Sequence, residues 1–533
     1  KTSLILEKIK ELSNNNKKSI IIVPEQASFE TEKKVLKTLG DNFMLNVQVL
    51  SFSRLYNEVY RNLGGLATKV LSDTEKTIFM SKAIKQVAND LKIWGKYSRS
   101  LNFSKTMLDT IGEFKINGIE PQEIKNAIDL TTSENLKLKL YDLTLIYETY
   151  NLLIAERYLD PADSLTKLYY TLEGYNFFAD KTVFIDGFKG FTGQQYKIID
   201  RILTQAQDVY IALTNDINSN KEYDIFTNIR SSALKIEKIA QSHNVKILEP
   251  QFLNNGYYIS SELLKLERLL CNSDTTKIED NSITICAAKT IFDEAEFAAR
   301  TIRKLVRTGN YRFGDFAIIA RDSEKYSQAI EYACDKNNVN CFFDKKIPLI
   351  AFPLSIAALS AIKALDFSTE NILKFHKSGI GVLSTDEISR LENYTYLWNI
   401  NGKIWFENWD MDVRGFVTDG ATEQDKLDLA EINELRIKAI TPILNLKNNF
   451  GENAKSMCSA IFNLFLECDF KTALDHLCKN LQDNTFKADA LKQSYDLTIK
   501  IFESLVNCYG NQNLSVSEFY EALSLALSKE EVK

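Results

Sequence analysis

One short stretch, residues 182–196 (TVFIDGFKGFTGQQY), most constrains what this chain can fold into. It opens with an apolar run that ends at Asp186, and Gly187 follows directly. A short run of Val, Phe and Ile before a glycine turn predicts a buried parallel strand, which ends at the edge where open α/β sheets bind ligands. In a site that hydrolyses a nucleotide, this Asp would face magnesium, and a second carboxylate beside it would direct the attacking water. The second position is glycine, so whether this chain can hydrolyse a nucleotide and act as a motor depends on Gly187.

Length and composition place the chain among ordinary globular proteins. Its 533 residues predict roughly two to four domains, because single hydrophobic cores stop growing well below that size. No run approaches the roughly 20 apolar residues that cross a bilayer, and the opening KTSLILEKI has no secretion-signal pattern. We therefore expect a cytoplasmic protein without membrane contact. Because the first methionine is Met44, we also expect that further residues precede Lys1.

Charge and cysteine content argue against several kinds of site. The net charge of −6 argues against wholesale coating of nucleic acid, although a local patch can still bind phosphates. The 8 cysteines form no C-x-x-C pair and only 3 histidines accompany them, so neither a zinc site nor a disulfide framework is predicted. We expect reduced, mostly buried thiols.

The order of apolar patterns predicts an α/β fold with two strand-bearing regions. Short apolar runs typical of strands occur at 19–23, 47–50, 183–186, 208–213 and 244–248, and again at 283–288, 316–320 and 340–344. Between about 65 and 170, and from about 352 onward, helical spacing of apolar residues replaces the strand signal. Each strand-bearing region is thus interrupted by a helical insertion, and the second sheet is expected to be incomplete.

This plan is that of superfamily 1 helicases, in which a nucleotide lies between two RecA-like cores and single-stranded DNA crosses them. A closer resemblance, to the AddB family of AddAB helicase-nuclease subunits, is carried by IIVPEQASFETEK (21–33), VLSFSRLYNEVY (49–60), FIDGFKGFTGQQY (184–196), YRFGDFAIIARD (311–322) and KSGIGVLSTDEISRLENYTYLWNINGKIW (377–405). The combination of VPEQ, IDGF with FT, and LENY is far more specific than any one of them.

The resemblance implies two RecA-like parallel-sheet cores of superfamily 1 helicase type, each with a helical insertion. The implied domains are a first core at 1–64 and 166–272, its insertion at 65–165, the first part of a second core at 273–351, and a second insertion at 352–533.

The resemblance also implies a vestigial site for ATP and magnesium. Lys1 and Thr2 match the last two residues of a Walker A loop, in which the lysine neutralises phosphate and the hydroxyl holds magnesium. Asp186 matches the magnesium contact, although an Asp after a strand can also simply cap its turn. Gly187 stands where active helicases have the catalytic Glu, so a contribution of about 10²-fold to 10⁴-fold from a general base is missing.

The second region carries a similar departure. FAIIARD matches the helicase segment in which an aromatic side chain stacks on adenine and an Arg reaches the terminal phosphate. Arg321 is present, whereas Ala320 replaces the aromatic residue. The alternative for Arg321 is an ordinary surface ion pair.

A predicted DNA-binding ledge follows the first two strands, at the edge where open sheets bind ligands. In helicases the matching segments use hydroxyls and amides for phosphates and an aromatic ring for a base. The residues concerned are Glu25, Gln26, Phe29, Ser51, Phe52, Ser53 and Arg54. The alternative is that Phe29 and Phe52 are core residues.

The resemblance finally implies a helicase-like subunit that pairs with an AddA-like motor as a heterodimer and scans single-stranded DNA for a recombination hotspot during double-strand break repair. An iron-sulphur cluster is implied only for a nuclease domain that lies beyond these residues. Two alternatives remain open, an active ATP-driven helicase and an interaction scaffold that does not contact DNA.

Overall fold

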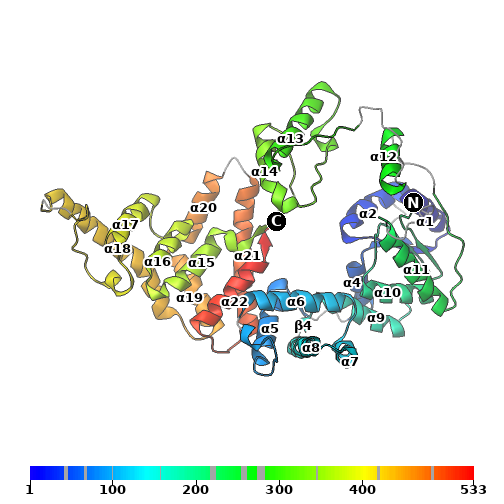
Figure 1. Cartoon of the computed structure of the whole chain (residues 1–533), viewed down its shortest axis with the longest axis horizontal. Coiled ribbons are helices and arrows are strands. Elements are labelled where there is room, and N and C mark those ends of the chain that lie inside the picture. Colours follow the sequence, from blue (N-terminus) through cyan, green and yellow to red (C-terminus); the bar gives the residue numbers. More distant parts are fainter. Residues whose placement is uncertain are drawn as a thin grey trace. The chain divides into compact units, whose positions relative to one another are not determined.

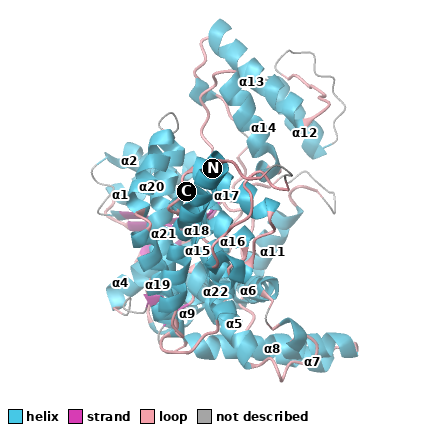
Figure 2. Cartoon of the chain, turned by 90° about the vertical axis from the view of Figure 1, so that its left-hand side faces the viewer, coloured by secondary structure: helices cyan, strands magenta, loops and turns pink. Residues whose placement is uncertain are grey.

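The computed structural model describes residues 1–40, 46–64, 69–98, 100–155, 158–215, 224–253, 261–272, 283–343, 346–416, 420–481 and 485–532. Most of its regular elements are helices (Figure 2). Contacts divide the chain into two compact units, one formed by 1–70, 111–123 and 157–343 and the other by 71–110, 124–156 and 344–533. The four domains implied by the resemblance are not tested by this division and stay a prediction.

The first unit is built on a parallel sheet with the strand order β2-β1-β5-β6. The strands are β1 (Lys18–Ile22), β2 (Val47–Leu50), β5 (Lys181–Ile185) and β6 (Asp208–Ile211). The central strands β1 and β5 are buried on both faces after their first residue, which explains their continuous Ile, Val and Phe runs. The first four predicted strands are confirmed, and the α/β class with them. The strand predicted at 244–248 is wrong, because these residues follow a helix without forming a strand.

Helices cover both faces of this sheet. Ile20 and Ile22 of β1 pack with α4, α9 and α10, whereas Ile21 packs with α1 and α2, since successive strand residues point to opposite faces. Helix α10 begins at a capping box in which Thr192 and Gln195 exchange hydrogen bonds. The helices are α1 (Thr2–Asn14), α2 (Glu25–Leu39), α4 (Phe52–Leu63), α9 (Ser164–Gly174), α10 (Gly193–Gln205) and α11 (Thr227–Ser242), which Figure 1 shows grouped around the N terminus.

The rest of the first unit contains short strands and a helical pair. Strand β3 (Lys69–Val70) pairs in parallel with β4 (Tyr158–Leu159). The remaining elements are η3 (Pro161–Asp163), α12 (Ser261–Asn272), α13 (Ile291–Thr308), η4 (Phe313–Asp315) and α14 (Ser323–Lys336).

The strands predicted for a second core are wrong. Residues 283–288, 316–320 and 340–343 contain no strand, and residue 344 lies outside the described residues. Several of their apolar side chains are exposed, with Ile285 and Ile319 both at 93%. An apolar run forms a parallel strand only when neighbouring strands accept its backbone hydrogen bonds, and these runs have none among the described residues. A second RecA-like core is therefore not confirmed.

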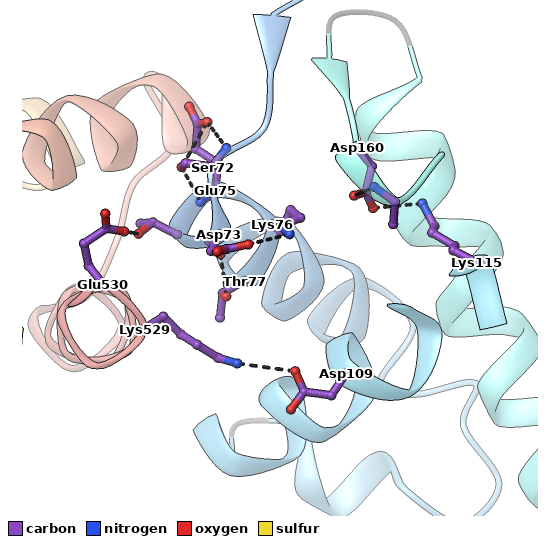
Figure 3. A network of polar contacts seen from close by, with 12 residues as sticks. Ser72, Asp73, Glu75, Lys76, Thr77, Asp109, Lys115, Asp160, Lys529 and Glu530 are labelled. Atoms are coloured by element: carbon purple, nitrogen blue, oxygen red, sulfur yellow. Dashed lines mark hydrogen bonds and ion pairs between the residues drawn. The ribbon is translucent and has the colours of Figure 1, made fainter. Parts of the chain in front are cut away.

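The second unit is helical and joins segments that are far apart in sequence. Thr74 of α5 donates to Glu530 at 3.3 Å. The Lys529 ammonium lies 3.4 Å from the Asp109 carboxylate of α6, as Figure 3 shows. Strands β7 (Ile347–Pro348) and β8 (Glu531–Val532) pair antiparallel. The helices are α5 (Asp73–Gln86), η2 (Gly95–Tyr97), α6 (Leu101–Ile116, shared with the first unit), α7 (Pro121–Leu130, also shared with the first unit), α8 (Glu134–Ile154), η5 (Leu349–Ala351), α15 (Pro353–Lys363), η6 (Ala364–Asp366), α16 (Thr369–Phe375), η7 (His376–Ile380), α17 (Thr385–Leu397), η8 (Gly402–Phe406), α18 (Glu423–Asn449), α19 (Ala454–Glu467), α20 (Phe470–Asn480), α21 (Thr485–Tyr509) and α22 (Val516–Lys529). Among the described residues, no helix has both the length and the apolar character that a bilayer span requires.

Candidate functional site at the carboxyl edge of the sheet

Asp186 lies where β5 ends, and both of its carboxylate oxygens accept hydrogen bonds. The Thr2 hydroxyl donates to Oδ2 at 2.8 Å, and the Gly187 backbone N–H donates to Oδ1 at 2.8 Å. The Asp186 N–H donates to the Ile22 carbonyl of β1 at 3.0 Å, which continues the sheet by one residue. The side chain is 5% exposed. We call Thr2, Asp186 and Gly187 the acid corner.

Gly187 has a backbone conformation that other residues rarely adopt. Its φ is +84°, and a Cβ atom at this position would lie 3.2 Å from Cδ of Pro24. A side chain here would therefore meet both an unfavourable φ and a proline ring that cannot rotate away. The turn therefore favours glycine, and a residue with a carboxylate side chain would be strained and crowded in this conformation.

The acid corner offers part of a magnesium site. Magnesium prefers oxygen ligands, and the Thr2 hydroxyl and Asp186 carboxylate place two such oxygens side by side at the start of helix α1. Among the described residues, no group of three or more His, Cys, Asp or Glu side chains could hold a metal ion. The two residues thus fit an ion whose other ligands come from phosphate or water.

The other two predicted nucleotide residues are placed differently. Lys1 lies beside the acid corner, and its Nζ donates to the Thr214 hydroxyl at 2.6 Å. Arg321 is exposed directly before α14, and within the described residues it has no hydrogen bond or ion pair with Lys1, Thr2 or Asp186. The structure therefore brings together three of the four predicted nucleotide residues.

The predicted ledge is formed where β1 and β2 end side by side. Ser51 is the N-cap of α4 and accepts the Arg54 N–H at 3.2 Å, and its hydroxyl lies 3.0 Å from that of Ser53. The Ser53 hydroxyl donates to the Glu25 carboxylate at the start of α2. Hydrogen bonds thus join the starts of α2 and α4, the two segments that the sequence predicted to act together, and Gln26 is exposed next to Glu25.

The two aromatic residues of the ledge have opposite environments. Phe29 is 62% exposed, and the Lys33 ammonium lies 4.3 Å from its ring centroid. Phe52 is 4% exposed and packs edge to face on Phe188, with ring centroids 5.5 Å apart. The ring of Phe52 therefore belongs to the core, which was its alternative interpretation, and Phe29 is the ring that a base could reach.

Sequence reasoning missed the contacts that hold the start of α10. The buried Lys115 ammonium lies 3.0 Å from Asp160 and 2.6 Å from Asp163, as Figure 3 shows for Asp160. Burial raises the pKa of Asp163, and the neighbouring Lys115 charge acts in the opposite direction. Gln194 of α10 donates to the Ala162 carbonyl at 2.6 Å, within the same turn. Single charged residues within helical patterns give no sequence signal for such a cluster, because the partners are 45 or more residues apart.

Gly193 shows why the FTGQQ sequence needs its glycine. A Cβ atom at Gly193 would lie 2.0 Å from the carbonyl oxygen of Asn117, so only glycine permits this approach of α10 to the end of α6. The T-x-x-Q spacing of the capping box was the one signal in the sequence that marked the helix start.

Comparisons with known proteins agree with these motifs. Residues 1–267 match a family model described as "ADDB, N-terminal". The chain is 31% identical over 556 residues to an ATP-dependent helicase/deoxyribonuclease subunit from Clostridioides difficile (strain 630), an alignment that covers 100% of this chain and 48% of that protein. It is 28% identical over 530 residues to the protein of the same name from Clostridium botulinum (strain Loch Maree / Type A3), covering 96% of this chain and 46% of that protein. The chain spans about half the length of these curated relatives.

Proposed function

The chain belongs to the AddB family, and from this premise we propose that it is the helicase-like, DNA-binding part of an ATP-dependent helicase-deoxyribonuclease and does not itself turn over ATP. In this proposal it holds single-stranded DNA on the ledge and scans it for a hotspot sequence during recombinational repair. A partner subunit of the AddA type supplies the motion.

The observation that carries the proposal is the conformation of Gly187. Hydrolysis of a nucleotide needs a group that orients and deprotonates water, and active superfamily 1 helicases place a Glu at this position. A positive φ would strain any side chain at this position, and the nearby Pro24 ring would crowd it. A catalytic Glu at this position would thus cost the turn stability, which supports the loss of turnover as a property of the fold.

Residual nucleotide binding remains compatible with the acid corner. Lys1 would neutralise phosphate, and Thr2 and Asp186 would hold magnesium through oxygen atoms that now bond to each other. The ion would supply charge neutralisation for the phosphates. We propose this as a binding role, separate from hydrolysis.

The ledge supports the DNA-binding part of the proposal. It combines one exposed ring, Phe29, with hydroxyl groups and the exposed guanidinium of Arg54, which pairs with Glu32 at 2.6 Å. Stacking and charge are the two contributions by which proteins hold single strands without reading sequence. The overall charge of −6 is compatible with this role, because contact with DNA depends on local charge.

ATP hydrolysis measured with magnesium, in the presence and absence of single-stranded DNA, tests the loss of turnover. We expect no DNA-stimulated hydrolysis, and equal background rates for the protein and its Asp186→Ala variant. DNA-stimulated hydrolysis that Asp186→Ala abolishes would instead establish an active motor.

Fluorescence anisotropy of a labelled single-stranded oligonucleotide tests DNA binding. We expect a rise on addition of protein at low salt, and a decrease of that rise as salt is added, because binding releases counterions and added salt opposes that release. Unchanged anisotropy at low salt would favour the interaction scaffold.

A further inference from the structure

Two cysteines of the first unit lie in direct contact although both are free thiols. The Sγ atoms of Cys334 and Cys341 are 2.7 Å apart, and neither residue is part of a disulfide. Cys334 belongs to α14, and Cys341 lies in the segment that follows this helix. The pair is separate from the acid corner and from the ledge, and the proposed function does not use it.

The C-terminal turn of α14 brings the two cysteines together. Helix α14 ends at Lys336, and Asn338 adopts a left-handed φ of +50°, which reverses the chain. The Val339 N–H then donates to the Cys334 carbonyl at 2.9 Å, so the returning chain runs beside the last helical turn. This hydrogen bond fixes the position from which the chain reaches Cys341 two residues later.

Helix α13 holds this turn in place. Arg303 donates to the Asn337 carbonyl at 2.8 Å, directly at the end of α14. Cys334 itself is 2% exposed and packs with Ala299, Ala333 and Val339 in the core between the two helices. The position of the Cys334 thiol is therefore determined by packing.

The two thiols differ in their access to solvent. Cys341 is exposed, so a dissolved reagent meets it first. Burial, and secondarily the adjacent Cys341 thiol, raise the pKa of Cys334 to about 12, so Cys334 stays protonated at neutral pH and is the poorer first nucleophile of the two. An exposed thiol next to a buried second thiol is the arrangement that resolves a mixed disulfide internally.

We propose that Cys334 and Cys341 form a reversible intrachain disulfide, with a low-molecular-weight disulfide such as oxidised glutathione as the oxidant. The Cys341 thiolate attacks one sulphur of the oxidant, forms a mixed disulfide and releases one thiolate. Cys334 loses its proton to water, attacks Sγ of Cys341 and releases the second thiolate. Two protein thiols are thus oxidised, and the small disulfide is reduced to two thiols.

The expected structural consequence is local. The new bond would attach the start of the 340–343 segment to the end of α14. Phe342, which follows Cys341, is 91% exposed, so this segment has little packing of its own to hold it. Oxidation therefore adds a covalent attachment where the described contacts are few.

Peptide mapping after oxidation tests this inference directly. The full chain is treated with oxidised glutathione, free thiols are blocked by alkylation, and the protein is digested with trypsin without reduction. Lys336 lies between the two cysteines, so trypsin separates them unless a disulfide joins their peptides. We expect the joined peptide pair, and its loss after treatment with dithiothreitol.

Cys286 is the matched control within the same chain, because it is exposed and no second thiol contacts it within the described residues. It should end as a glutathione adduct under the same conditions. Glutathione on Cys341, together with an alkylated Cys334, would overturn the inference.

Two single variants test the proposed disulfide by outcomes that a loss of folding would not produce. Cys341→Ser changes only an exposed side chain, and it should abolish the joined peptides while leaving the melting temperature of the reduced protein unchanged. Cys334→Ala should stop the reaction at the glutathione adduct of Cys341. A Cys334 peptide that is still joined to another peptide in Cys341→Ser would show that Cys334 uses a different partner and would reject the pair.

Discussion

The acid corner and the ledge occupy the same edge of one sheet, yet they differ in exposure. Asp186 is 5% exposed and both its oxygens accept hydrogen bonds within the protein. Phe29 is 62% exposed, and the guanidinium of Arg54 pairs with the Glu32 carboxylate at the surface. The carboxylate of the acid corner is thus bonded within the protein, whereas the ring and the guanidinium of the ledge face solvent. Under the proposed function, this difference corresponds to a sheet edge that lacks the geometry for hydrolysis in one part and offers a surface for binding in another.

The largest effect is expected from Lys115→Met, in the buried cluster that holds the start of α10. This change leaves the buried Asp160 carboxylate without its cation, so the free energy of unfolding should fall by about 3 to 5 kcal/mol in urea titrations. Lys18→Met is the matched control, because its pair with Asp180 is exposed and should be worth about 0 to 1 kcal/mol. Equal losses in the two variants would contradict a supporting role for the buried cluster.

The next effect is expected at Gly187, the position where the resemblance implies that a catalytic Glu is missing. Gly187→Glu should lower the free energy of unfolding by about 2 to 4 kcal/mol and leave ATP hydrolysis at background, because backbone strain and the Pro24 contact add together. Gly64→Glu is the matched control, because it introduces the backbone strain without a steric contact. Gly64 has a φ of +79° with nothing within 4 Å of an added Cβ, so its loss should be only about 1 to 2 kcal/mol. A stable Gly187→Glu variant that hydrolyses ATP would refute the interpretation of the acid corner.

Phe29→Ala tests the exposed part of the edge. Loss of one stacked base should weaken binding of a single-stranded oligonucleotide by about 5-fold to 100-fold in fluorescence anisotropy titrations. The control is Tyr396→Ala, which removes an aromatic ring that is 89% exposed but lies outside the ledge. If Tyr396→Ala weakened binding and Phe29→Ala did not, the DNA site would have to be placed elsewhere.

The smallest effect is expected at Arg54. If its guanidinium contacts one phosphate, Arg54→Ala should reduce the slope of log Kd against log salt by about 1. Stability should change by only about 0 to 1 kcal/mol, because the pair with Glu32 is exposed. Arg61→Ala, at the other end of α4, removes a similar exposed pair with Glu58 and should leave the slope unchanged. Identical slopes for both variants would exclude Arg54 from the phosphate contacts.

Much of the sheet could be predicted from the sequence because its strands are continuous apolar runs. SIIIV and TVFI are buried on both faces, a pattern that few other local structures produce. Equally apolar runs at 283–288 and 316–320 formed no strand, since a strand also depends on neighbours that local sequence cannot reveal. The same limit applies to the Lys115 cluster, whose partners meet only when α6 and the turn before α9 pack together.

By itself, the sequence determined the parallel sheet, the family and the absence of a carboxylate at residue 187, because these follow from residue types and their order. Only the tertiary structure decided which of two ledge phenylalanines is available, since Phe52 is covered by Phe188 from a distant segment. It also decided that glycine is favoured at residue 187, because φ is positive there and because the pairing of β1 with β5 places Pro24 3.2 Å from an added Cβ. Exposure and backbone strain arise from contacts between residues far apart in the chain, and the order of residues does not contain them.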